Sequence, residues 1–296
     1  MNDIPNQLSY FPGCSLATTA KENNTSLKSF LNHFDIDLSE IEDWNCCGSS
    51  STHSVNSKLA LSLAARNLFL APPNQQVLIA CPGCFLRLGY AKMTLNASNE
   101  KQTQYEKHFD RPYNKNLELV HFFELLAKMS GKGFFKNLTG RLNGLKIAPY
   151  YGCMLARPPS MNKEKNHYGL IENTMATLGG EPIRWPFLSS CCGTFLSVSK
   201  PKIAEKLVNR IMKGAIQSGA ECIVTACAMC HLNLEIRCKP GNRLPIFHFS
   251  ELLSLALDKK ASKDWFKRHL INPEPLLEKK QLIPCQNGRK SNGFFR

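Results

Sequence analysis

Thirteen cysteines carry most of the chemistry available to this chain of 296 residues. Ten of them form two sets of five in one order: a single cysteine, an adjacent pair running into glycine, and a CxxC. The sets are Cys14, Cys46, Cys47, Cys81 and Cys84, then Cys153, Cys191, Cys192, Cys227 and Cys230. The single cysteine and the pair are separated by 31 and 37 residues, and the pair and the CxxC by 33 and 34. This agreement indicates an internal duplication.

Five thiols per repeat indicate a metal centre in each half. Iron–sulfur clusters are held by thiolates, commonly four per cluster. A CxxC turn aims two sulfurs at one point, whereas adjacent cysteines in an extended segment point to opposite faces. Both members of the pair reach one centre only if the backbone turns sharply, and Gly48 and Gly193 permit such a turn. The pattern therefore favours an iron–sulfur cluster in each half.

Other uses of cysteine stay open. Structural zinc needs only four ligands, and its CxxC elements usually lie closer in sequence. A metal-free dithiol–disulfide pair at either CxxC would suit a thioredoxin-like site but leaves six repeated cysteines unexplained. Cys222, Cys238 and Cys285 lie outside the repeat, and we interpret them as small packing residues.

Several sequence features other than the cysteines limit the possible functions. The chain has no closely spaced ferredoxin run, no GxGxxG and no P-loop, so electrons must be exchanged with another subunit. The polar start lacks the plan of a secretion signal, and no apolar run reaches the roughly 18 residues of a membrane span. We therefore expect a cytoplasmic protein, in which cysteines serve as metal ligands or redox groups more often than as structural disulfides.

The net charge of +14 and a pI near 9.2 suggest an anionic partner. A membrane surface, a charged substrate or an acidic partner protein would fit, and so would solubility alone. Nucleic acid fits least, because lysine and arginine are not clustered with aromatic residues and no nucleic-acid fold signature is present.

Strands and helices alternate in the expected elements that position the cysteines. Short apolar runs end at the cysteines, and helical periodicity lies between them over 59–70 and 203–216. The expected strands are 8–11, 77–80, 146–151 and 222–226. This alternation predicts an α/β fold of two pseudo-repeated, Rossmann-like domains, each a small parallel sheet flanked by helices. The cysteines would then lie at the carboxyl ends of strands, where such sheets bind ligands.

The repeat sets the expected boundaries. The first domain spans 8–145 with an inserted loop at about 96–116, the second spans 146–258, and 259–296 forms a C-terminal arm and basic tail. His121 and His248 each begin a repeated His-x-x-Glu. We interpret it as a helix start in which the glutamate reaches back to free N–H groups; a catalytic histidine is the alternative.

Both halves resemble the cysteine-rich CCG domain, and two copies without ferredoxin modules resemble the B subunit of heterodisulfide reductase. The likeness covers about 8–257, and 43–48, 151–159 and 230–234 support it. The resemblance implies that each set of five cysteines binds a non-cubane [4Fe–4S] cluster, although Cys227-Ala228-Met229-Cys230 lacks the proline that follows Cys81. It implies an oxidoreductase that cleaves or forms a disulfide between two facing clusters.

The resemblance also implies partners. Electrons would come from the flavin-containing A subunit of such a complex through its ferredoxin-like C subunit, and the substrate would be an anionic disulfide or a protein-bound sulfur. Arg87, Arg157 or Lys200 could hold such a substrate. Duplicated CCG proteins also resemble the electron-transfer, quinone-linked or membrane-associated subunits of succinate/fumarate and glycolate/lactate oxidoreductases. A zinc-binding scaffold is the third alternative, and the substrate, direction and oligomeric state stay open.

Overall fold

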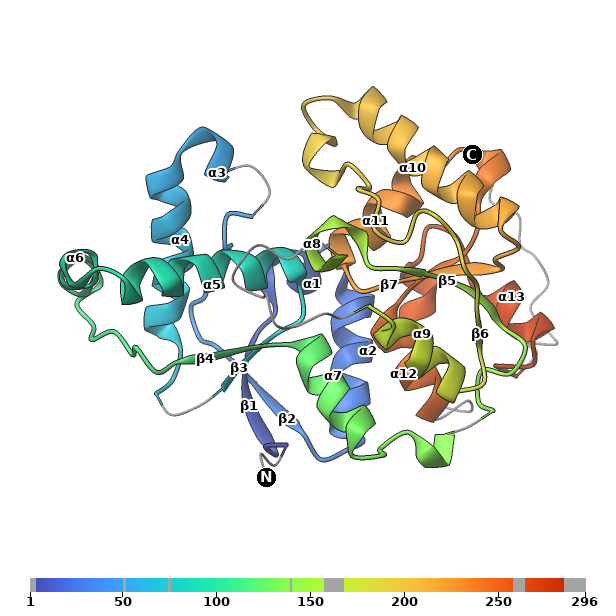
Figure 1. The fold of residues 1–296 in the computed structure, drawn as a ribbon, viewed down its shortest axis with the longest axis horizontal. Helices are drawn as coiled ribbons and strands as arrows, with labels where there is room; N and C mark the ends of the chain where they lie inside the picture. The colour runs from blue at the N-terminus through green and yellow to red at the C-terminus, as the bar shows by residue number, and fades with distance from the viewer. Residues whose placement is uncertain are drawn as a thin grey trace.

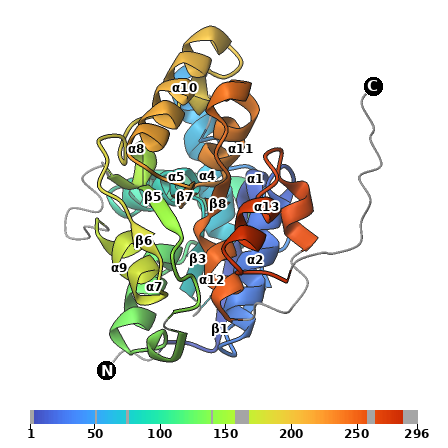
Figure 2. The ribbon, with the colours of Figure 1, turned by 90° about the vertical axis from the view of Figure 1, so that its right-hand side faces the viewer.

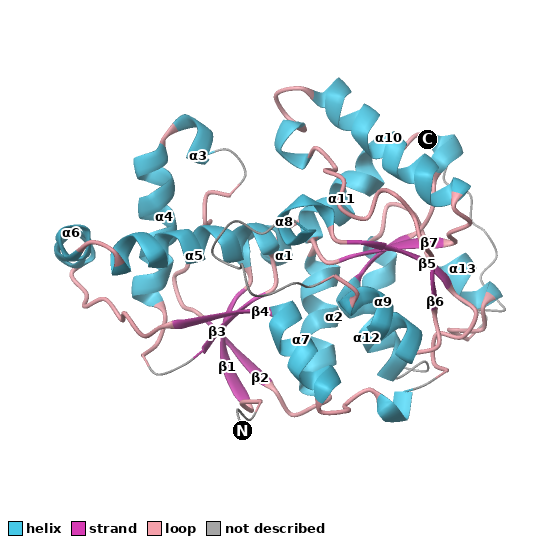
Figure 3. Ribbon diagram, viewed as in Figure 1, coloured by secondary structure: helices cyan, strands magenta, loops and turns pink. Residues whose placement is uncertain are grey.

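Two parallel sheets of four strands form the framework of the computed structural model, which describes residues 4–49, 52–73, 76–138, 140–156, 168–257 and 264–284 (Figures 1 and 3). The first sheet has the order β2-β1-β3-β4 and the second the order β6-β5-β7-β8. The strands are β1 (Gln7–Phe11), β2 (Asp37–Glu40), β3 (Gln76–Ile79), β4 (Glu118–His121), β5 (Lys146–Tyr150), β6 (Glu181–Pro182), β7 (Cys222–Thr225) and β8 (Ile246–His248). All described pairings are parallel. The predicted α/β fold and its duplication are therefore confirmed.

Helices connect the strands of both sheets. In the first half they are α1 (Gly13–Ala17), α2 (Lys21–Asn32), α3 (Thr52–Val55), α4 (Ser57–Leu70), α5 (Pro82–Asn96), α6 (Asn99–Phe109) and α7 (Phe122–Gly131). In the second half they are α8 (Gly152–Ala156), α9 (Leu170–Thr177), α10 (Pro201–Gln217), α11 (Ala228–Arg237), α12 (Phe249–Leu257) and α13 (Glu274–Lys279). Short 3-10 turns are η1 (Lys136–Leu138), η3 (Thr194–Leu196), η4 (Pro240–Asn242) and η5 (Asp264–Arg268). None of the described helices is both long and apolar enough to span a membrane.

The repeated His-x-x-Glu motifs begin α7 and α12, as predicted. His121 is the N-cap of α7, and its Nδ1 accepts a hydrogen bond from Phe123 N–H at 3.2 Å. In the second half Glu251 Oε2 accepts from the backbone N–H of His248 at 2.7 Å, which is a capping-box contact. Both histidines are buried and serve the helix start.

The two halves pack against each other through equivalent helices. Helix α2 of the first half lies along α12 of the second, and α7 of the first lies against α9 of the second (Figures 1 and 2). The rings of Phe123 and Phe249 meet edge to face at 5.2 Å, and the Oγ atoms of Ser26 and Ser250 are 2.7 Å apart. One hydrophobic core runs through both halves. The duplication thus forms a pseudo-symmetric pair, and the two sheets enclose a shared layer of helices.

The inserted loop expected over 96–116 is wrong for most of its length. Residues 99–109 form α6, which Ser98 caps through its side chain. The segment contains few aliphatic residues, but Tyr105 and Phe109 stack on each other and Phe109 packs on Phe69. It connects α5 to β4 within the first sheet and does not join the halves.

The C-terminal arm packs on the second half through α13 and on α2 of the first half through η5. Leu277 of α13 is fully buried, and Lys280 Nζ lies 2.6 Å from Glu221 Oε2. Cys285 and the basic tail lie outside the described residues. The proposed division at 145/146 and 258/259 stays a prediction.

Candidate functional site

The first set of cysteines gathers at the carboxyl end of the first sheet. β1 runs into α1, which carries Cys14, and β3 runs through Cys81 into α5, which carries Cys84 in its first turn. The pair Cys46-Cys47 lies in the loop after β2. The sulfurs of Cys14 and Cys46 are 3.6 Å apart, and those of Cys47 and Cys84 are 3.2 Å apart. Residues separated by 32 and 37 positions are therefore brought together.

The second set repeats this arrangement. Cys153 Sγ lies 3.7 Å from Cys191 Sγ, and Cys192 Sγ lies 3.4 Å from Cys230 Sγ. Cys227 follows β7 as Cys81 follows β3. In both halves the single cysteine therefore meets the first member of the pair, and the last cysteine of the CxxC meets the second.

Glycines allow the sulfurs to approach. Gly48 and Gly193 have φ of +73° and +77°, which confirms the sharp turn predicted after each pair. Gly13 and Gly152 precede the single cysteines and also have positive φ. A Cβ at Gly13 would lie 2.7 Å from Cys84 Sγ, and one at Gly152 would lie 3.3 Å from Cys230 Sγ. The repeated Gly-Cys step was the sequence signal for this cradle.

Buried asparagines position the adjacent pairs, and sequence reasoning missed them. Asn67 on α4 accepts from Asn45 N–H and donates to the Asn45 carbonyl, both at 2.9 Å, directly before Cys46. Asn233 on α11 donates to the carbonyl of Cys192 at 2.8 Å. An asparagine among the other polar residues of a helix carries no metal-site signal by itself.

Neighbouring sulfurs shift one another's acidity. Hydrogen bonding with Cys14 lowers the pKa of Cys46 to about 2, and hydrogen bonding with Cys84 lowers that of Cys81 to about 7. The pKa of Cys84 is raised, because its thiol is held in the protonated form by hydrogen bonds with Cys47 and Cys81. In the second half hydrogen bonding with Cys230 lowers the pKa of Cys192. The thiolate, the form that binds metals, is therefore favoured at Cys46, Cys81 and Cys192, while the sulfurs hydrogen-bonded to them keep their protons.

One cavity brings Cys81 of the first set beside the second set. The first half contributes Cys81 and Gly83 to a cavity whose other walls come from the second half. Those walls include Tyr151, Met154, Cys153, Cys191, Cys192, Thr194, Phe195, Cys227, Met229 and Cys230. Helix α5 contacts α8 and α1 contacts α11, which brings the cysteine-bearing helices together at the centre of the molecule (Figure 1).

Exposure differs among the sulfurs. Cys14, Cys46 and Cys191 are exposed, Cys153 is half-buried, and the other six of the ten repeated cysteines are buried. Each set therefore has one edge at the surface and one in the interior. A centre in such a place can exchange electrons with a partner at the surface and with its twin inside.

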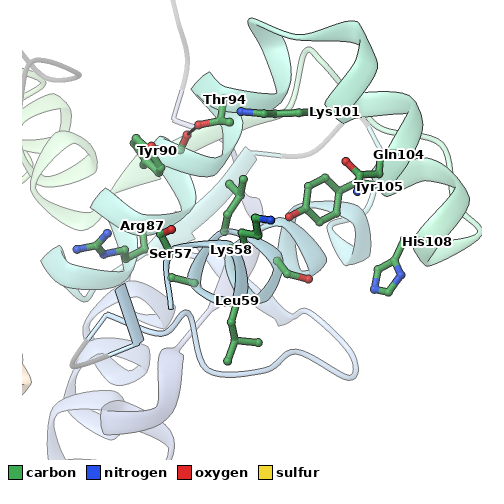
Figure 4. Close-up of a pocket in the computed structure, with 13 residues that line it drawn as sticks. Ser57, Lys58, Leu59, Arg87, Tyr90, Thr94, Lys101, Gln104, Tyr105 and His108 are labelled. Carbon is green, nitrogen blue, oxygen red and sulfur yellow. Dashed lines mark hydrogen bonds between the residues drawn. The ribbon is translucent and has the colours of Figure 1, made fainter. Parts of the chain in front are cut away.

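The cations predicted near a substrate do not line this cavity in the described part of the chain. Arg87 lines a separate cleft of about 830 Å³ between α4, α5 and α6, together with Lys58, Tyr90 and Lys101 (Figure 4). Lys200 is exposed before α10. Arg157 lies outside the described residues.

Two cysteines outside the repeat are buried away from the sets. Cys222 lies on β7 with no exposure, and burial raises the pKa of its thiol. Cys238 ends α11, and its sulfur contacts the carbonyl of Glu235. Their surroundings agree with packing roles.

The donor set fits an iron–sulfur cluster in each half. Each site offers five thiols from three segments, with sulfurs in contact in pairs and glycines where a Cβ would crowd the neighbouring atoms. Among the described residues, no histidine, aspartate or glutamate forms a metal-binding group with the sulfurs of the two sets. The residues that would hold the clusters are therefore the ten repeated cysteines.

Comparisons with known proteins agree with the duplication. The cysteine-rich domain called CCG matches residues 8–89 and 147–235. The 8-methylmenaquinol:fumarate reductase membrane anchor subunit of Wolinella succinogenes is 29% identical over 91% of this chain and 99% of its own length. The B subunit of the ferredoxin/F420H2-dependent CoB-CoM heterodisulfide reductase of Methanosarcina acetivorans is 28% identical over 85% and 89%. Homology to both kinds of protein supports a cysteine-rich electron-transfer subunit.

A solved structure shares the fold. A hypothetical protein from Helicobacter pylori superposes with a TM-score of 0.72 at 14% identity. The match covers 91% of this chain and about half, 53%, of that chain. At this identity the likeness bears on the fold alone.

Proposed function

This chain belongs to the cysteine-rich domain family, and on that basis we propose that it holds two [4Fe–4S] clusters and relays electrons within a membrane-linked reductase complex. The observation that carries the proposal is a cavity in which Cys81 of the first set lies beside all five cysteines of the second. Cys14, Cys46, Cys47, Cys81 and Cys84 hold one cluster; Cys153, Cys191, Cys192, Cys227 and Cys230 hold the other. Both are non-cubane, as five ligands per cluster would suit.

Iron–sulfur clusters supply one-electron transfer at potentials set by cluster charge, hydrogen bonds to sulfur and solvent exposure. The chain's own residues set these quantities. Tyr151, Met154 and Met229 make the wall between the sets largely apolar, while the exposed Cys14 and Cys191 leave each set an open edge. This division supports electron passage from a partner, through one centre, to the other.

The choice of a membrane-linked complex follows from two observations. The relative named as a membrane anchor subunit of a fumarate reductase is matched over nearly its whole length. The net charge of +14 favours docking on an acidic protein or an anionic membrane surface. The protein would then be cytoplasmic and attached to the membrane through its partners, and its electron partner would be a flavin subunit.

Disulfide chemistry is the second candidate, and the two complete sets favour it. A relay could lose one set, whereas cleavage of an S–S bond between two centres needs both. An anionic disulfide would meet Tyr151, Met154 and Phe195 in the joint cavity, whose described lining contains no lysine or arginine. That lining favours the relay. In the disulfide case the partners would be the ferredoxin-like C subunit and the flavin-containing A subunit of a heterodisulfide reductase-like complex.

The two candidates differ in their response to thiols and quinols. The complex, purified anaerobically through a tag on this chain, should couple a menaquinol analogue to its dehydrogenase partner. Adding 2-mercaptoethanesulfonate, a small anionic thiol, to the oxidised protein should leave the electron paramagnetic resonance spectrum unchanged. A new thiol-dependent signal, with disulfide-dependent turnover, would instead favour the second candidate.

A further inference from the structure

A second cluster of metal-binding side chains lies buried beside the second cysteine set, and the proposed relay makes no use of it. His231 and Glu235 are four residues apart on one face of α11, directly after Cys230. His269 follows η5, and Glu251 lies on α12. All four residues are at most 9% exposed. Such a concentration of ionisable groups in a core needs a partner charge or an ion.

Each histidine has one ring nitrogen held by an oxygen. His231 Nδ1 is 3.1 Å from Asn23 Oδ1, and His269 Nε2 is 2.8 Å from Glu251 Oε1. An amide carbonyl and a carboxylate only accept, so these ring nitrogens carry the hydrogens. In the neutral form of each ring, the lone pair then lies at His231 Nε2 and at His269 Nδ1. Metal-binding histidines are commonly oriented by just such a contact to a carboxylate or carbonyl.

The two lone pairs converge on one carboxylate oxygen. Glu235 Oε1 is 3.6 Å from His231 Nε2 and 3.2 Å from His269 Nδ1. Among the described residues none of these three atoms makes a hydrogen bond of normal geometry. Ligands at about 2.0–2.1 Å from a tetrahedral zinc ion are roughly 3.3 Å apart. The two separations from Glu235 Oε1, 3.2 Å and 3.6 Å, are close to this value.

The remaining atoms of the cluster act as supports. Glu235 Oε2 accepts from Leu270 N–H at 3.0 Å, and Glu251 Oε2 accepts from His248 N–H at 2.7 Å. Only Oε1 of Glu235 is thus left for an ion, while Glu251 orients His269. A divalent cation would compensate the charge of both carboxylates in this pocket of the core.

We propose that His231 Nε2, Glu235 Oε1 and His269 Nδ1 bind one divalent transition-metal ion of the zinc type, with Asn23 and Glu251 as orienting partners. The ion ties α11, the helix that carries Cys230, to the C-terminal segment and, through Asn23, to α2 of the other half. This site is separate from the sulfur ligands and contains no cysteine. It uses two imidazoles and one carboxylate, a ligand set found in zinc sites.

Zinc K-edge X-ray absorption on the full-length protein tests this site. The protein is loaded anaerobically with iron and sulfide, then with Zn2+, and freed of excess metal. We expect about one zinc per chain in a shell of nitrogen and oxygen at about 2.0–2.1 Å, with imidazole scattering. Zinc held by the cysteine sets would instead show sulfur at about 2.3 Å, so failure of the iron clusters is recognised separately.

Two pairs of variants assign the ligands. Glu235→Gln and His269→Gln should each lower zinc content at least tenfold and remove the imidazole signal. Their matched controls are Glu205→Gln, a surface residue on α10, and His108→Gln, an exposed residue on α6, and both should retain zinc. If a ligand variant does not fold, the zinc shell of the unaltered protein decides. Zinc absent from that protein, or bound only by sulfur, would overturn the proposal and leave a buried ion-pair network.

Discussion

The side-chain amide of Asn233 donates a hydrogen bond to the backbone carbonyl of Cys192 at 2.8 Å. Its Oδ1 accepts from Ser197 Oγ at 2.7 Å and from Arg237 Nε at 3.0 Å. Asn233 is 5% exposed and lies one helical turn after Cys230. One buried residue thus connects the adjacent cysteine pair to the helix that carries the CxxC.

Replacing this asparagine should weaken the second centre without removing a ligand. We expect Asn233→Ala to lose the bond to Cys192 and to cost about 1–3 kcal/mol of stability, because a buried carbonyl is left without a donor. The second cluster should be lost faster on exposure to air or chelator, while the first is unchanged. The measurement is the decay of visible absorbance, with exposed Asn173→Ala on α9 as the control. Equal decay in the two variants would contradict this role.

A side chain at the glycine before each single cysteine should hinder cluster assembly, because there is little space beside the sulfurs. Gly13→Ala places a Cβ 2.7 Å from Cys84 Sγ, whereas Gly152→Ala places one 3.3 Å from Cys230 Sγ, and both positions have positive φ. We expect Gly13→Ala to lose about half of the bound iron and Gly152→Ala to lose less. Iron and sulfide analysis after reconstitution measures this.

Gly131→Ala on α7 is the control for these glycines, because its Cβ would meet nothing within 4 Å. It should retain full iron content and normal stability. Full iron content in Gly13→Ala would show that the cradle does not constrain the sulfurs.

The helix layer between the sheets should make both halves unfold together. Phe249 is fully buried and meets Phe123 of the other half at 5.2 Å. Phe249→Ala should lower the free energy of unfolding by about 3–5 kcal/mol. Denaturant unfolding followed by circular dichroism should show one transition in both proteins. Two separated transitions in the unaltered protein would mean that the halves are independent domains.

Stability should fall at acidic pH partly through Glu221. Partial burial alone would raise its pKa, but Lys280 Nζ at 2.6 Å and the N–H of Lys146 at 3.0 Å lower it below its usual value. A lowered folded-state pKa gives stability that is present at neutral pH and is lost as pH falls through the acidic range. The contribution is about 1 kcal/mol or less, because both side chains are partly exposed.

Glu221→Gln tests this linkage. Its melting temperature should lie below that of the unaltered protein at neutral pH, and the two should converge as the pH falls through the acidic range. Glu205→Gln, whose partner Lys239 is farther away at 3.4 Å and more exposed, should show little difference at either pH. A constant difference between Glu221→Gln and the unaltered protein at all pH values would contradict the assignment.

Cysteine spacing and apolar runs were sufficient to predict the two central strands of each sheet, the strand ends that carry the cysteines, and the turns at Gly48 and Gly193. These features depend on short stretches of sequence that occur twice in the chain, so each copy of the pattern supports the interpretation of the other. The helix at 99–109 was missed because two partly buried aromatic residues, Tyr105 and Phe109, make its contacts with the core in a stretch with few aliphatics. A search for regularly spaced aliphatic residues does not detect a helix whose core contacts are aromatic.

The contacts between the halves could not be predicted from the sequence. Asn23 and His231 are 208 positions apart, and nothing in the local pattern of either residue indicates that they meet. The same holds for Cys81 beside the second cysteine set. Arg87 was named as a cation that could hold a substrate, but it lines the cleft between α4, α5 and α6 (Figure 4).

Iron and sulfide content, measured with Mössbauer spectroscopy on anaerobically purified protein, tests the central claim most directly. We predict about eight iron atoms per chain in two four-iron clusters, the number that two [4Fe–4S] sites require. Changing Cys46, Cys47, Cys81 and Cys84 to serine should remove about half of that iron, and changing Cys191, Cys192, Cys227 and Cys230 should remove the other half. A folded, colourless protein after reconstitution with iron and sulfide would contradict the account.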